Sequence, residues 1–98
     1  MSGHKEADVM DRKTGNSIRQ LRRDARRGDP YAMVELGRMY QTGDGVRAGS
    51  LKAWRWFEKA NAHGLRAGGL MSELLRQSLR GRERRRLELF IRLRRLFG

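Results

Sequence analysis

Apolar residues recur along this chain at intervals of three and four residues, the spacing that is typical of amphipathic helices. Ile18, Leu21 and Ala25 form the first stripe and predict a helix over residues 16–27. Residues 1–15 mix both charge signs without such a stripe, so we expect a polar, weakly ordered lead there. With one proline and long stretches free of turn dipeptides, the chain is predicted to be an all-α domain.

The second predicted helix has a well-defined start. Asp29 is a favourable N-cap, and Pro30 suits the first helical position. The apolar face of this helix is expected to bury Ala32, Met33, Leu36, Gly37 and Tyr40. Because a glycine inside a helix costs about 1 kcal/mol relative to alanine, we interpret Gly37 as a position where a neighbouring helix comes close.

A third helix is predicted from Ser50, as its cap, to about Ala62. Its buried face is expected to contain Ala53, Trp56, Phe57 and Ala60. Leu51 and Trp54 lie off this face, and we expect them to pack on the helix that follows, over residues 67–79. Because a short connection joins the second and third helices, the two should pack antiparallel.

Two basic helices are predicted in the C-terminal third, over residues 67–97. The first carries an apolar stripe made of Leu70, Met71, Leu74, Leu75 and Leu79. The second resumes after Gly81, and Arg94 interrupts its apolar arc of about 220°. This arc contains Leu87, Leu89, Phe90, Ile91, Leu93, Leu96 and Phe97. It is wider than one packing partner requires.

The stretch from residue 25 to residue 64 resembles a Sel-one-like repeat, a relative of the tetratricopeptide helical hairpin. The matching positions, in order and nearly at the family's spacing, are Ala25, Gly28, Ala32, Leu36, Gly37, Tyr40, Gly43, Gly45, Val46, Lys52, Ala53, Trp56, Lys59, Ala60 and Gly64. Gly49 and Asn61 depart from the pattern, and Gly68 and Ser72 prevent assignment of a second full repeat. The resemblance implies a hairpin over residues 29–64, flanked by capping helices, that binds other proteins.

The segment Gly43-Asp44-Gly45 is interpreted as a corner between two helices. A phosphate-binding loop would need a preceding strand and a following Gly-Lys-Ser/Thr, and neither is present. A calcium loop would need further carboxylates at loop spacing around Asp44. We therefore expect the two glycines to supply backbone freedom, with Val46 packing back onto the helices.

The residues that carry most enzyme chemistry are sparse. The chain has no cysteine, and its two histidines, His4 and His63, are far apart in sequence and have no clustered carboxylates beside them. No serine has a base at recognisable spacing, and the carboxylates are scattered singly among arginines. We expect no catalysis, no metal, no cofactor and no small-molecule substrate. Without an apolar leader or a long apolar run, the protein is expected to be cytoplasmic.

The net charge of +12 directs attention to anionic partners, although an arginine-rich genome would give the same bias. The first hypothesis is an acidic protein that contacts Tyr31, Val34 and Arg38 on the second helix, opposite its core face. The second is nucleic acid bound by the tail arginines, which are Arg80, Arg82, Arg84, Arg85, Arg86, Arg92, Arg94 and Arg95. The third is an anionic membrane surface, or a partner groove, that receives the last helix. That helix would otherwise cover the open end of the hairpin.

Overall fold

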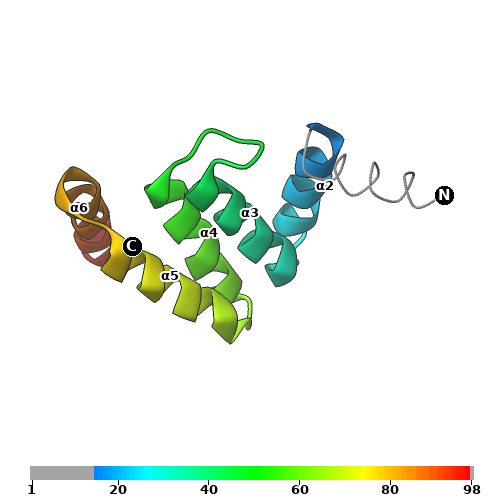
Figure 1. The fold of residues 1–98 in the computed structure, drawn as a ribbon. Coiled ribbons are helices and arrows are strands. Elements are labelled where there is room, and N and C mark those ends of the chain that lie inside the picture. The colour runs from blue at the N-terminus through cyan, green and yellow to red at the C-terminus, as the bar shows by residue number, and fades with distance from the viewer. Residues whose placement is uncertain (1–14, 98) are drawn as a thin grey trace.

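A computed structural model describes residues 15–97 of the chain, and the regular structure there is entirely helical. The helices are α2 (Gly15–Arg26), α3 (Pro30–Thr42), α4 (Ser50–Ala62), α5 (Arg66–Ser78) and α6 (Gly81–Phe97), arranged as in Figure 1. The predicted all-α class is confirmed. The expectation for the N-terminal lead, and His4 within it, falls almost wholly outside the described residues.

Helices α3 and α4 form the antiparallel hairpin that the sequence predicts. The Asp29 carboxylate caps α3 by accepting from the amide of Tyr31 at 2.9 Å. At the other end Gly43 adopts the left-handed conformation (φ 78°) that a side chain would strain. The chain then turns back, and the Gly49 amide donates to the Tyr40 carbonyl at 2.9 Å. The Gly-Asp-Gly segment is therefore a corner, with Val46 packed on the first core cluster.

Two glycines let neighbouring helices approach α4 closely. A Cβ added at Gly37 would lie 2.5 Å from the Phe57 ring, which confirms the predicted close contact within the hairpin. A Cβ at Gly68 of α5 would lie 2.5 Å from the Phe57 carbonyl oxygen. Helices α3 and α5 thus press on α4 from two sides, and there is no room for a methyl group at either position.

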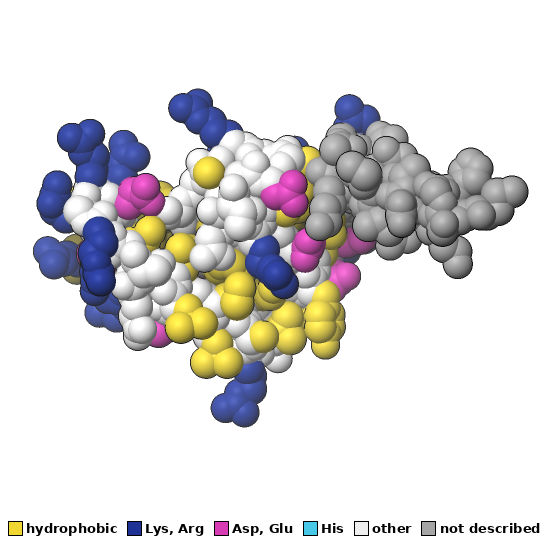
Figure 2. All heavy atoms as spheres, viewed as in Figure 1, with side chains coloured by type: hydrophobic (Ala, Val, Ile, Leu, Met, Phe, Trp, Pro, Cys, Tyr) yellow, Lys and Arg dark blue, Asp and Glu magenta, His cyan; other side chains and the backbone are white. Residues whose placement is uncertain are grey.

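The apolar stripe predicted for α5 is only partly buried. Leu70 and Leu74 are 68% and 63% exposed, whereas Gly68 and Ser72 face α4. Close packing explains the difference, because the face that meets α4 must carry small residues. The two leucines consequently point outward, and Figure 2 shows apolar side chains gathered along this side of the molecule.

The described core has two parts. The first joins α2 and α3 to the end of α4 and consists of Ile18, Ala25, Ala32, Met33, Leu36, Met39 and Ala60. The second lies between α4, α5 and α6 and consists of Ala53, Trp54, Phe57, Leu75, Leu79, Leu87 and Ile91. The predicted packing of Trp54 on α5 is confirmed. Tyr40 and Trp56, which were expected in the core, are only half-buried, because their helices turn these two side chains toward a groove beside α6.

Candidate functional site

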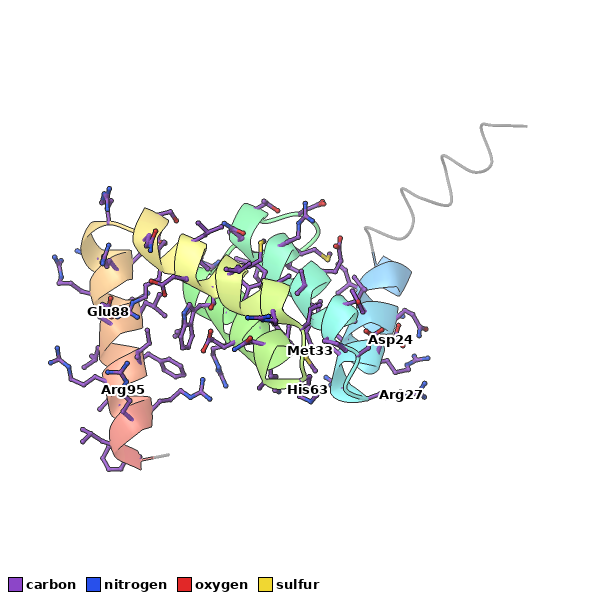
Figure 3. All side chains as sticks on the ribbon, turned by 90° about the horizontal axis from the view of Figure 1, so that it is seen from below. Asp24, Arg27, Met33, His63, Glu88 and Arg95 are labelled. Carbon is purple, nitrogen blue, oxygen red and sulfur yellow. The ribbon has the colours of Figure 1, made fainter. Side chains whose placement is uncertain are left out.

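Helix α6 stands across one end of the other helices instead of lying along α5 (Figure 3). It is attached through Leu87 and Ile91, which are buried in the second core cluster with Trp54. Phe90 adds an edge-to-face contact with Trp54, with ring centroids 6.1 Å apart. One face of α6 therefore covers the hairpin, as the sequence hypothesis of a capping helix anticipates.

Polar contacts hold the first half of α6. The Arg76 guanidinium of α5 donates from Nε and from a terminal nitrogen to the two oxygens of Glu88, both at 2.8 Å. These hydrogen bonds lower the pKa of the Glu88 carboxyl and raise the pKa of the Arg76 guanidinium. Ser50 donates to Glu83 in the first turn of α6. The expectation that Ser50 caps α4 is wrong, because the N-cap is Gly49 and Ser50 is the first helical residue.

A groove of about 500 Å³ opens where α6 meets α3 and α4. It is lined by Tyr40, Lys52, Arg55, Trp56, Lys59, Phe90 and Arg94. Four of these side chains are cationic, three are aromatic, and none is a carboxylate. The groove therefore combines positive charge with flat apolar surface.

Cations and rings alternate inside the groove at cation–π distance. The Lys59 ammonium lies 5.2 Å from the centre of the Trp56 ring, and the Lys52 ammonium lies 5.5 Å from the Tyr40 ring. Arg55 contacts the Phe90 ring in the same way at 5.5 Å. Within residues 15–97 these cations form no ion pair with a carboxylate. No carboxylate of this part of the chain compensates their positive charge.

Two further groups complete the groove. Arg94 reaches the Phe90 ring from α6, with its guanidinium carbon 5.9 Å from the ring centre. Arg22 of α2 donates to the Tyr40 hydroxyl at 3.3 Å, which holds that ring in place and adds a cation at the edge. The cations that line the groove therefore come from α4 and α6, and α2 contributes Arg22 behind the Tyr40 ring.

Most residues of this groove were not predicted from the sequence. Lys52, Arg55 and Lys59 were not proposed as site residues, although their spacing of three and four positions places them on one face of α4 with Trp56. This spacing could have identified the three residues as one basic face. The contribution of Phe90 had no local signal, because it depends on how α6 crosses α4.

The outer face of α6 remains open. Leu89 and Leu93 are 55% and 43% exposed, and Leu96 is exposed on the same side one turn further on. Arg85 and Arg92 flank Leu89 in a shallow hollow. The wide apolar arc predicted from the sequence therefore divides into a packed half and an exposed half with arginines at its border.

The three residues proposed for protein contact on α3 differ in accessibility. Tyr31 is 72% exposed and Arg38 is also exposed. Val34 is half-buried and contacts both core clusters. Val34 is consequently the least available of the three to a partner.

The tail arginines surround α6 and do not form one patch. Arg84 lies 3.9 Å from Glu88, and Arg94 turns toward the groove. The others are exposed, and Figure 2 shows basic side chains clustered over this end of the molecule. The exposed members are Arg80, Arg82, Arg85, Arg86, Arg92, Arg94 and Arg95.

Other predicted features occupy structural positions. Gly28, Gly45 and Gly64 all adopt positive φ at helix ends or in the corner. His63 follows α4, and its Nδ1 lies 2.9 Å from the Lys59 carbonyl oxygen, so this histidine caps the helix. No three potential metal ligands come together within residues 15–97. None of the helices described is long and apolar enough to span a bilayer. No family model, curated protein or solved structure matches the chain.

Proposed function

We propose that this chain is a non-catalytic protein-interaction module, an adaptor or small regulator built on a Sel-one-like hairpin. The observation that carries this proposal is the outer face of α6, where Leu89, Leu93 and Leu96 are exposed side by side. Anchors at positions i, i+4 and i+7 are typical of a helix that packs on a partner helix or groove.

The partner is an acidic amphipathic segment of another protein. Arg85 and Arg92 border the leucines, and acidic side chains on the partner would pair with them. A second copy of this chain is a poor partner, because the same arginines would then face each other. The apolar stripe is also short, because Arg82 and Arg86 occupy its continuation toward the start of α6. A membrane surface would meet a longer apolar face.

A photo-crosslinking residue at position 93 tests this proposal in cells that express the protein naturally. We expect one discrete acidic protein to be crosslinked there, and the Leu89→Ser, Leu96→Ser double variant to lose it. A crosslinker at Gln77, which is exposed on α5, is the matched control. Products that contain only lipid or a second copy of the chain would refute the proposal, as would the same products from position 77.

Tyr31 and Arg38 provide a second possible contact on α3. If they belong to the same partner surface, the Tyr31→Ala, Arg38→Ala double variant should weaken capture of the protein crosslinked at position 93. Unchanged capture would remove these two residues from the proposed interface.

Nucleic-acid binding through the tail arginines is the second candidate function. The net charge of +12 supports it, because Lys and Arg contacts with phosphates supply affinity that falls with salt. The scatter of the arginines around α6 weakens it. An affinity for RNA or DNA that disappears at physiological salt would reflect net charge alone.

A further inference from the structure

We propose that the groove between α3, α4 and α6 binds a short segment of single-stranded nucleic acid. This surface is separate from the outer face of α6 and is independent of the protein contact proposed there. The charge of the groove, its aromatic walls and its size support this assignment.

The charge of the groove suits successive phosphates. Lys52, Arg55 and Lys59 spread over about 10 Å along α4, given a rise of 1.5 Å per residue. Arg94 faces them from α6, and no carboxylate lines the groove. Cations held this close repel one another, and a polyanion that enters the groove relieves the repulsion.

The aromatic walls favour nucleic acid over an acidic peptide. Trp56 and Tyr40 are half-buried, and a lysine ammonium already lies over each ring. Both lysines are exposed, so each can turn to a phosphate and leave the ring face to a base. Aromatic faces beside a basic track are the usual means of holding single strands. A peptide of Asp and Glu would pair with the cations but has no planar group to stack on the rings.

The size of the groove favours a single strand over a duplex. A volume of about 500 Å³ is within the range of small-molecule sites, and it accommodates one or two nucleotides. A base can stack there only when it is unpaired. The exposed arginines Arg85 and Arg86 of α6 do not line the groove, so they lie outside the proposed site.

The test uses fluorescence anisotropy of a labelled ten-nucleotide oligouridylate with the full chain, at 50 mM and 150 mM NaCl. Oligothymidylate of the same length, a ten-base-pair duplex and a decaglutamate peptide are the comparison ligands. We expect both single strands to bind at 150 mM NaCl at least tenfold more tightly than the duplex or the peptide. Equal or tighter binding of decaglutamate would overturn the proposal in favour of an acidic protein.

Charge-matched variants locate the site. Lys52→Gln with Lys59→Gln removes two charges from the groove, and Arg85→Gln with Arg86→Gln removes two from the exposed side of α6. We expect the groove pair to weaken binding at least tenfold and the α6 pair less than threefold. The groove pair should also lower the slope of log affinity against log salt by about 1.4. If both double variants lost the same affinity, binding would depend on net charge alone and the proposal would be overturned.

The aromatic contribution is tested separately. Trp56→Ala should weaken binding about tenfold without changing the salt slope, because stacking releases no counterions. Trp56→Phe keeps a ring and should recover most of that affinity, which also controls for loss of packing. If neither variant changes the affinity, bases do not stack on this wall and the proposal fails.

Discussion

Helices α5 and α6 both pack against α4, but different kinds of contact hold them there. Gly68 brings the backbone of α5 onto the backbone of α4, so this pair tolerates no change of volume. Helix α6 instead reaches α4 through side chains, with Leu87 and Ile91 against Trp54, and it is bonded to α5 through the pair of Glu88 with Arg76. The contact of α5 with α4 is part of the packing that defines the fold. The contact of α6 with α4 positions a helix whose other faces border the groove and the solvent.

The difference indicates where binding can evolve without loss of the fold. In α5, which packs through its backbone, the residues that face α4 must be small enough to fit. In α6, which is attached through a few side chains, many positions are free to carry charged or apolar residues, and α6 carries both. Substitutions at the two contacts should separate their contributions to stability.

Trp54→Ala should have the largest effect on stability. The ring is buried between α4, α5 and α6, so its removal leaves a cavity at the attachment of α6. We expect the free energy of unfolding to fall by about 3–5 kcal/mol in urea denaturation. Trp56→Ala, at the half-buried ring two residues on, should cost much less. Similar losses at both positions would show that Trp54 does not anchor α6.

Gly68→Ala should destabilise the contact of α5 with α4 by about 1–3 kcal/mol, because its methyl group would meet the Phe57 carbonyl and the Ala60 Cβ. Gly69→Ala is the matched control. Its methyl group would meet only the end of the Asn61 side chain, and alanine is the better helix former. The Tm of Gly68→Ala should be lower than that of wild type, and the Tm of Gly69→Ala should be close to that of wild type. The reverse order would refute the close contact.

Glu88→Gln should cost about 1 kcal/mol at pH 7, since it weakens a bidentate pair that is about 30% exposed. Because the folded-state pKa of Glu88 is lowered, its contribution is present above its ordinary pKa of 4.5 and is lost as the pH falls through the lowered value. The difference in stability between wild type and Glu88→Gln should therefore shrink between pH 6 and pH 3. A difference that is independent of pH would contradict the assigned pair.

Leu89→Ser combined with Leu93→Ser should have the smallest effect on stability. Both leucines are exposed, so the free energy of unfolding should change by less than about 0.5 kcal/mol. Urea denaturation measures this directly. A large loss would mean that the outer face of α6 belongs to the fold, and the proposed interface would have to be abandoned.

Much of the fold was predictable from local signals. The Asp29 cap, Gly37 in the middle of a helix and the Gly-Asp-Gly corner act within a few residues, and the structure confirms each. The arc of α6 was correctly predicted to exceed one packing partner, because helical periodicity determines it. The protein partners, and the resemblance to a Sel-one-like repeat, stay predictions.

The predictions failed for residues whose burial depends on how two helices pack against each other. Leu70 and Leu74 have the right periodicity for a core, but close approach at Gly68 selects the opposite face of α5. Trp56 was expected in the core because its helical spacing places it on one face with Ala53 and Phe57. Its position at a groove wall depends on the crossing of α6 over α4, and no short stretch of sequence encodes that crossing.

The central claim is that the groove beside α6 holds a single strand against Trp56. The most direct measurement is the tryptophan emission of a Trp54→Phe variant, in which Trp56 is the single tryptophan. Adding oligouridylate at 150 mM NaCl should quench this emission along the same binding curve as the anisotropy. The reciprocal Trp56→Phe variant, which reports from buried Trp54, should change little. Binding by anisotropy without quenching of Trp56 would place the strand elsewhere and contradict the account.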